Sequence, residues 1–302
     1  MPMKIMKFGG SSLGNAERIV HVAKVIKQYL SFDDIVVVVS AMYGVTDKLI
    51  YLFDTYKAAD FEKAHYEMAL LYKAHREVLD ELRLGREEAL QEGKKLFAMF
   101  GQLSMYLLLC KRFSMADYDY VISFGERWNS LLTAAVLKKC DILAQAIDAS
   151  DVMVATSVYG NAKVIIDKTE IKAQKLLNPL IKEGVTPVVT GFFAGTKEGK
   201  VVTLGRGGSD YTAAILGYAL NATEVILWKE VDGVFSRDPK KDGNAIFYPY
   251  LSYKKALALA KQGAKVLHPE AMRPVSSKNI VVRVKNTFKP EWEGTKIWKE
   301  ES

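Results

Sequence analysis

Two glycine-rich segments of this chain contain the residue types that bind phosphate groups. The first is KFGGSS, in which Lys7 precedes Gly9, Gly10 and Ser11. Glycines let a backbone approach a ligand closely, N–H groups at a helix start attract anions, and a lysine adds positive charge. This lysine precedes the glycines, whereas in the Walker pattern of P-loop enzymes it follows them. The segment therefore predicts a phosphate site of a different kind, with a plain glycine turn as the alternative.

The second segment, TLGRGGSD, surrounds Arg206 with glycines and ends at Asp210. The guanidinium of Arg206 offers two parallel N–H donors to a carboxylate or a phosphate. Ser209 or Asp210 is expected to cap the helix predicted over residues 211–220. A capping loop alone has no use for a guanidinium at its centre, so the sequence favours a ligand site here.

Hydroxyl and acidic side chains follow other apolar runs. Ser40 and Thr46 bracket a turn after residues 35–40, and open α/β sheets bind ligands at the carboxyl ends of their strands. Glu126 stands just before the helix predicted over residues 128–139. For this residue alone, the simpler interpretation is an acid that the helix dipole favours.

The apolar runs that precede these motifs are typical of parallel strands in an α/β sheet. Residues 3–8 are largely apolar, residues 35–40 and 185–191 are rich in β-branched residues, and each run leads toward a glycine-bearing turn and a helical pattern. This alternation indicates strands joined by crossover helices. Further strands are expected at residues 142–147, 163–166, 201–204, 224–228 and 280–284. We therefore predict an open, mainly parallel sheet flanked by helices.

A helical insertion is expected over residues 46–113, because this segment lacks proline and strand signals and is rich in Leu, Ala, Lys and Glu. It is longer than a simple strand–helix unit needs. A boundary near residues 190–200 divides the chain into two lobes, about 1–195 and about 196–302. No flexible linker separates the lobes, so we expect them to share one continuous sheet.

The composition excludes several classes of protein. The chain has 302 residues, of which 49% are hydrophobic, so it can enclose a core and a cleft. Its 42 Lys and Arg against 35 Asp and Glu give a net charge of +7, but the positive charges are scattered, and we expect no nucleic-acid partner. No apolar run is long enough to cross a membrane. The cysteines and histidines lack metal-ligand spacing, so we expect no protein-held metal and a reducing, cytoplasmic location.

The order of the motifs along the chain resembles the aspartate kinase family, which has the amino acid kinase fold. These motifs are KFGGSS, VSAMYGVT, FGER, TLGRGGSD, VDGVFSRDP, GAKVLHP and NTF. The resemblance runs from residue 4 to about residue 297. It implies that ATP phosphorylates the β-carboxylate of L-aspartate to give 4-phospho-L-aspartate, the first step toward lysine, threonine, methionine and diaminopimelate. It also implies Mg²⁺ carried mainly by the nucleotide phosphates.

The resemblance assigns roles to residues by their position in the motifs, with amino-acid binding in the first lobe and nucleotide binding in the second. It implies catalytic roles for Lys7, Asp210 and Lys265. It places aspartate among Ser40, Thr46, Glu126, Arg206, Ser209 and Asp210. It places ATP among Lys7, Gly9, Gly10, Ser11, Trp228, Lys229, Asp232, Phe235, Lys240 and Lys265. We expect Arg206 to bind the α-carboxylate, and Glu126 with Asp210 to bind the ammonium group. No general base is needed, because a β-carboxylate with a pKa of about 3.9 is already ionised at neutral pH.

The chain departs from the family pattern in three ways. Lys229 and Glu230 stand where the family usually has Thr-Asp, and Phe235 stands where it commonly has tyrosine. The family normally continues into paired ACT regulatory domains, whereas this sequence ends at Ser302. From the sequence alone we expect no inhibition by lysine or threonine at a separate site, and any homodimer is expected to form through catalytic-lobe surfaces such as residues 46–113.

Two alternatives to an aspartate kinase are open at this point. The first is another kinase of the same fold, acting on acetylglutamate, glutamate, carbamate or uridylate. The second is an amino-acid or nucleotide sensor that kept the fold without catalysis. FGER, GRGGSD and GAKVLHP favour aspartate, and the intact Lys7, Arg206 and Asp210 argue against a sensor.

Overall fold

The structure of the protein is a computed structural model that describes residues 1–237, 239, 241–261 and 269–299. It is built on an eight-stranded sheet with the strand order β10-β12-β11-β7-β1-β2-β4-β3. The strands are β1 (Met3–Phe8), β2 (Asp34–Val39), β3 (Ala144–Ile147), β4 (Thr186–Thr190), β7 (Glu224–Lys229), β10 (Tyr250–Ser252), β11 (Val281–Asn286) and β12 (Thr295–Trp298). Every neighbouring pair is parallel except the antiparallel pair β11 and β12. The predicted open, mainly parallel sheet is confirmed, and the pairing of β7 with β1 joins both parts of the chain in one sheet.

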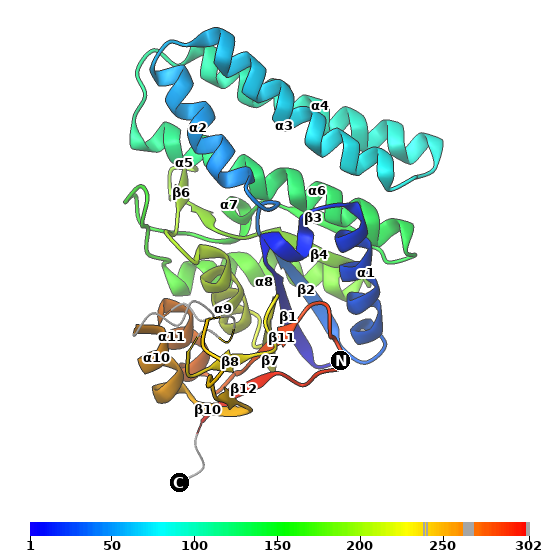
Figure 1. The fold of residues 1–302 in the computed structure, drawn as a ribbon, viewed down its shortest axis with the longest axis vertical. Helices are drawn as coiled ribbons and strands as arrows, with labels where there is room; N and C mark the ends of the chain where they lie inside the picture. Colours follow the sequence, from blue (N-terminus) through cyan, green and yellow to red (C-terminus); the bar gives the residue numbers. More distant parts are fainter. Residues whose placement is uncertain (238, 240, 262–268, 300–302) are drawn as a thin grey trace.

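Helices cover both faces of this sheet and give a three-layer fold (Figure 1). One face packs against α1 (Ala16–Leu30) and α6 (Phe124–Lys139). The other packs against α8 (Ile166–Lys182), α9 (Gly208–Ala219), α10 (Tyr253–Lys261) and α11 (Pro269–Ser277). Successive side chains of a strand point to opposite faces, so Met6 and Phe8 enter the first core while Ile5 enters the second. Burial on both faces also explains the continuous apolar run of β2.

The predicted helical insertion is confirmed and forms α2 (Val45–Lys57), α3 (Phe61–Glu81) and α4 (Arg86–Leu109), which stand above the sheet in Figure 1. The short helix α5 (Met115–Ile122) leads back to α6. Trp128 of α6 stacks on Phe100 of α4 with ring centroids 3.9 Å apart, and His75 of α3 packs against Trp128. Burial lowers the pKa of His75 to about 4, so this imidazole stays neutral among the aromatic rings. The cluster fixes the insertion to α6.

Two of the predicted strands differ from the structure. Residues 163–166 form no strand, because Val164 makes only an isolated bridge with Ala155 and the helix α8 begins at Ile166. The apolar side chains of that segment pack at a helix start instead. β6 (Val201–Thr203) forms as predicted, but it pairs with β5 (Phe193–Gly195) outside the main sheet. The remaining short elements are η1 (Gly10–Leu13), α7 (Ala149–Val152), β8 (Val234–Phe235) and β9 (Phe247–Tyr248).

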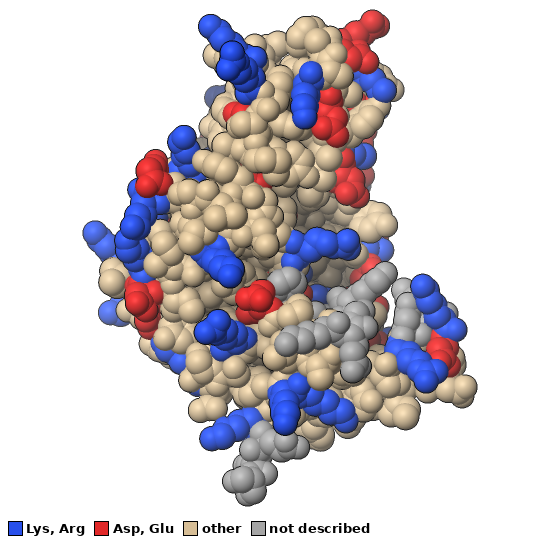
Figure 2. Space-filling view, turned by 90° about the vertical axis from the view of Figure 1, so that its left-hand side faces the viewer, with Lys and Arg blue, Asp and Glu red and all other residues tan. Residues whose placement is uncertain are grey.

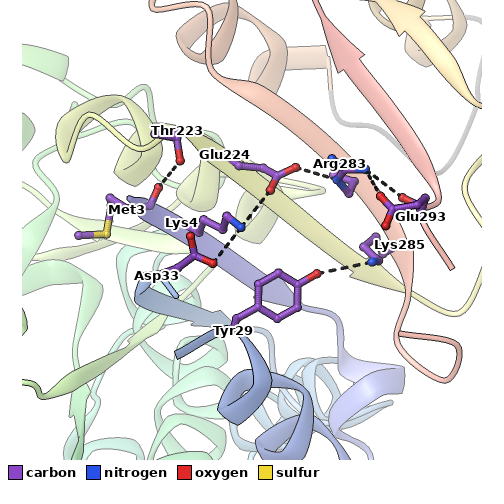
Figure 3. A network of polar contacts seen from close by, with 9 residues as sticks. All are labelled: Met3, Lys4, Tyr29, Asp33, Thr223, Glu224, Arg283, Lys285 and Glu293. Carbon is purple, nitrogen blue, oxygen red and sulfur yellow. Dashed lines mark hydrogen bonds and ion pairs between the residues drawn. The ribbon is translucent and has the colours of Figure 1, made fainter. Parts of the chain in front are cut away.

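A network of ion pairs joins neighbouring strands at the amino ends of the sheet (Figure 3). The ammonium of Lys4 lies 2.9 Å from a carboxylate oxygen of Asp33 and 3.7 Å from one of Glu224. Arg283 contacts Glu224 at 2.7 Å and Glu293 at 2.6 Å. These contacts connect β1, β7 and β11 through partly buried charges. They hold the strands together at the end of the sheet opposite to the glycine-rich loops.

Charged side chains are distributed over the surface of the molecule. Figure 2 shows Lys and Arg spread over one face and interleaved with Asp and Glu, rather than gathered into one tract. Within the described ranges, no helix is long and apolar enough to cross a membrane. In the same ranges, no three His, Cys, Asp or Glu side chains group together as candidate metal ligands.

Candidate active site

A cavity of about 390 Å³ opens at the carboxyl ends of β1, β2 and β7. This is the end of the sheet at which the sequence predicted that ligands bind. The predicted residues that line the cavity are Lys7, Gly10, Ser11, Ser40, Thr46, Glu126, Ser209, Asp210 and Lys229. These residues come from five separate segments of the chain, which the sheet and its helices bring to one place.

Three charged side chains form the centre of this cavity. The ammonium of Lys7 lies 2.7 Å from Oδ1 of Asp210, and the ammonium of Lys229 lies 2.6 Å from Oδ2 of the same carboxylate. Burial alone would raise the pKa of Asp210, but Lys229 and Lys7 outweigh it and hold that pKa well below its usual range. Burial also lowers the pKa of Lys7, against the attraction of Asp210. Asp210 is therefore an ionised carboxylate held between two ammonium groups.

Strand register explains why the two lysines meet. In the parallel pair β1 and β7, Lys7 lies opposite Leu227. Side chains in register share one face of the sheet, and the side chain two positions further along points to the same face, so Lys229 follows Leu227 there. Helix α9 packs on this face and carries Asp210 in its first turn. The two lysines and the aspartate thus converge from two strands and one helix.

The first glycine loop is fixed by contacts on both sides. A Cβ atom on Gly10 would lie 2.6 Å from the carbonyl oxygen of Ala41, so the loop approaches the β2–α2 connection too closely for any other residue. The hydroxyls of Ser12 and Thr287 are 2.7 Å apart. The guanidinium of Arg18 donates to the carbonyl of Ser11 and forms an ion pair with Glu230 at 3.0 Å. Glu230, one of the residues that depart from the family pattern, is therefore linked to this loop through Arg18.

Gly10→Ala is expected to lower the free energy of unfolding by about 1–3 kcal/mol, because the new methyl group would force the loop away from Ala41. Gly9→Ala is the matched control, since a Cβ there lies 3.8 Å from its nearest neighbour, an ordinary contact. Urea denaturation of both variants measures the difference. Equal stability of the two variants would contradict the close approach at Gly10.

Glu126 lies in the first turn of α6 and is buried at the cavity wall. Burial raises its pKa to about 8, although the N–H of Ala41 and the charge of Lys7 favour the ionised form. Its Oε2 atom has no hydrogen-bond partner among the residues that the structure describes. A buried oxygen without a partner usually accepts a hydrogen bond from a ligand or water. This carboxyl group is therefore available to a donor group that enters the cavity.

Hydroxyl groups line the wall beside Glu126. Ser40 donates a hydrogen bond from Oγ to Oγ of Ser209 at 3.1 Å. The amide of Asn129 donates to the carbonyl oxygen of Ser40 at 2.6 Å and holds the end of β2. Thr46 lines the cavity from the first turn of α2. This wall offers small polar groups that suit a polar substrate.

Several predicted residues lie outside the cavity. Arg206 is exposed on the loop before α9 and is not part of the lining. The ring of Trp228 is fully buried and stacks on that of Phe8, with ring centroids 5.8 Å apart, so the predicted contact of Trp228 with ATP would have to come from its backbone. This follows from register, because Trp228 pairs with Phe8 and shares its face of the sheet.

The other predicted nucleotide contacts are also separate from the cavity lining. Asp232 accepts hydrogen bonds from Lys289 at 2.8 Å and from Asn286 at 2.6 Å, and Phe235 packs on Phe247. Gly9 is the N-cap of η1 and does not line the cavity. Lys240 and Lys265 lie outside the described residues.

The predicted cap of the helix after the second glycine loop is wrong. Gly207, with φ of 73°, is the N-cap of α9, so Ser209 and Asp210 lie inside the helix and face the cavity. Sequence reasoning also missed Gly191 and Asn129. A Cβ on Gly191 would lie 2.6 Å from Cβ of Ser209, so this glycine lets α9 approach the end of β4. The only signal was a glycine directly after an apolar strand.

Comparison with known proteins agrees with this architecture. Residues 2–286 match the family described as "Amino acid kinase family". The chain belongs to this family. As an amino acid kinase family member it is 38% identical over 301 residues to Aspartokinase 3, chloroplastic, of Arabidopsis thaliana, covering 97% of this chain and 52% of that protein. It is 35% identical to Aspartokinase 1, chloroplastic, of the same plant, covering 98% and 52%. The chain thus spans about half the length of the curated relatives it matches.

Solved structures give the same placement of this family member. The crystal structure of E. coli aspartokinase III in complex with aspartate and ADP superposes with a TM-score of 0.89 and 28% identity, covering 99% of this chain and 65% of that one. UMP kinase from Bacillus anthracis, at 16% identity and a TM-score of 0.54, shares the fold alone. The predicted amino acid kinase fold is therefore confirmed.

Proposed function

We propose that this chain phosphorylates the β-carboxylate of L-aspartate with ATP and releases ADP and 4-phospho-L-aspartate. The observation that carries the proposal is one cavity that combines an ionised Asp210 between two lysines with the buried carboxyl group of Glu126. The two lysines suit a phosphate chain, and the carboxyl group of Glu126 suits an ammonium group. Similarity to proteins named aspartokinases, one of them solved with aspartate and ADP, supports the same acceptor.

The amino-acid end of the substrate suits the wall beside Glu126. The Oε2 atom of Glu126 would accept a hydrogen bond from the ammonium group. The hydroxyls of Ser40, Thr46 and Ser209 are available to a carboxylate. Both oxygens of Asp210 already contact lysines, so we now assign the ammonium to Glu126 and not to Asp210. Arg206 stays the proposed partner of the α-carboxylate, which requires its exposed side chain to bend over the opening.

Phosphoryl transfer would need positioning and charge neutralisation more than proton transfer. An oxygen of the β-carboxylate attacks the γ-phosphorus, and the bond from phosphorus to the bridging oxygen breaks with its electron pair left on ADP. Lys7 and the N–H groups around Gly10 and Ser11 would stabilise the negative charge of the phosphates. The acceptor is ionised at neutral pH, so no base has to remove a proton.

Magnesium fits this cavity as an ion carried by the nucleotide. Asp210 is engaged at both oxygens, and a pKa of about 8 keeps Glu126 mostly protonated at neutral pH, so neither buried carboxyl group is free as a main ligand. A bound magnesium ion would supply charge that neutralises the nucleotide phosphates. Lys7 and Lys229 would act on the same negative charge from the protein side.

An assay of ADP release across acceptors tests this function. The chain should turn over with L-aspartate and not with acetylglutamate, glutamate, carbamate or UMP. Turnover with one of the others and not with aspartate would move the chain to another activity of the same fold. A homodimer through residues 46–113 and a cytoplasmic location stay predictions, and the two plant relatives are named as chloroplastic.

Aspartate binding at neutral pH should release a proton. Glu126 has a pKa of about 8 in the empty site, and an ammonium group at Oε2 stabilises its ionised form and lowers that pKa. Since binding releases a proton below about pH 8, affinity for aspartate should rise as the pH approaches 8 and then level off. Calorimetry in buffers of different ionisation enthalpy measures the proton release. Glu126→Gln should abolish the buffer dependence, and its persistence in that variant would contradict this role.

A further inference from the structure

We propose that Lys229 is a catalytic residue that donates a hydrogen bond to the γ-phosphoryl group of ATP while Asp210 holds its ammonium in place. The resemblance to aspartate kinases implies that residue 229 contacts the nucleotide, but it assigns no role to this contact. Members of that family usually have threonine at this position. The inference deepens the proposed function. Its binding test uses nucleotide alone, so it does not depend on the identity of the acceptor.

The position of Lys229 suits a terminal phosphate. Its ammonium contacts Oδ2 of Asp210, whereas Lys7 contacts Oδ1, and its side chain lines the cavity. The side chain of Lys229 is 19% exposed, against 8% for Lys7, so Lys229 is the more accessible of the two cations. Lys7 lies beside Gly9 at the phosphate loop. A phosphate chain that follows this loop toward Asp210 therefore meets both ammonium groups.

The charge of this cluster points to an anionic ligand. Two ammonium groups and one carboxylate leave one positive charge in excess, and Glu126 is mostly neutral at neutral pH. Asp47 is exposed at the rim, and Glu230 pairs with Arg18. Within the described residues, Asp210 is the one acceptor that Lys229 contacts. An ammonium has three N–H donors, so donors remain for a ligand.

A purely structural role does not explain the second lysine. Lys7 already neutralises Asp210, and a further, half-buried cation adds a desolvation penalty without removing an unpaired charge. A γ-phosphoryl group gives that cation a partner. It has three oxygens and carries much of the negative charge that must be stabilised during transfer.

The test compares ADP with the non-hydrolysable β,γ-imido analogue of ATP, both with magnesium, by calorimetry. Lys229→Thr should weaken binding of the analogue by about 10–100-fold and change binding of ADP by less than about 3-fold, because only the analogue has a γ-phosphoryl group. Lys229→Arg keeps the positive charge, so its affinity for the analogue should stay close to that of the wild type. Lys4→Thr is the matched control: its side chain is 21% exposed, and its ion pair lies at the opposite end of β1, so neither affinity should change.

An equal loss of affinity for ADP and for the analogue in Lys229→Thr would contradict the proposal, because it would show that Lys229 only holds Asp210 in position. Lys229→Gln, which keeps a long polar side chain without charge, gives the same comparison if the threonine variant fails to fold. If Lys229→Thr loses affinity for the analogue and not for ADP, but the wild-type chain phosphorylates another acceptor, the proposed function is overturned and the role of Lys229 is supported. A wild-type chain that binds neither nucleotide would contradict both.

Discussion

Asp210→Asn is expected to lower the free energy of unfolding by about 3–5 kcal/mol and to abolish most of the turnover, because it leaves the buried ammonium of Lys7 and the half-buried ammonium of Lys229 facing a neutral amide. The same change removes the group that positions both lysines. Urea denaturation at neutral pH measures the first effect, and an ADP-release assay measures the second.

Two controls separate this effect from ordinary loss of an ion pair. Asp232→Asn also removes a carboxylate from a lysine, but the pair with Lys289 is exposed, so its stability should change by less than about 1 kcal/mol. Adding Lys229→Met to Asp210→Asn removes one of the unpaired charges and should restore part of the lost stability. A double variant that is less stable than Asp210→Asn alone would contradict the assignment of the destabilisation to uncompensated charge.

Lys7→Met is expected to lower kcat by about 10²–10³, because it removes a preorganised charge from the transferring phosphoryl group. KM for aspartate should change little, since the lysine acts on the phosphate side of the reaction. Lys285→Met is the matched control: Lys285 is equally buried on β11 but lies outside the cavity, so kcat should stay near that of the wild type. Near-normal kcat in Lys7→Met, with normal folding by circular dichroism, would contradict the role of Lys7.

Local patterns along the sequence predict much of this fold. The short apolar run at residues 3–8, which leads into a glycine turn, places β1 at its observed limits, Met3–Phe8. The helical insertion could be predicted because residues 46–113 lack proline and are rich in Leu, Ala, Lys and Glu. Such a long segment indicates helices without any knowledge of how they pack. The cavity residues around Lys7 and Asp210 follow from glycine loops at strand ends, because open sheets gather these loops at one edge.

The sequence alone does not show which face of the sheet a side chain takes when this depends on which strands are neighbours. Trp228 turns its ring into the core, and Lys229 turns its ammonium into the cavity, only because β7 pairs with β1 in one particular register. Periodicity along a single strand cannot supply that register. In the same way, the close approach of Gly191 to Ser209 joins β4 to α9, and no local pattern connects these two segments.

Transfer of a phosphoryl group to the β-carboxylate of aspartate can be measured by trapping the acyl phosphate product. Hydroxylamine displaces phosphate from an acyl phosphate and leaves a stable hydroxamate. After incubation of the chain with ATP, magnesium, L-aspartate and hydroxylamine, we expect aspartate β-hydroxamate by mass spectrometry, in an amount that matches the ADP formed, and much less of it with Asp210→Asn. ADP formation without any hydroxamate, or a hydroxamate of the α-carboxylate, would contradict the proposed transfer.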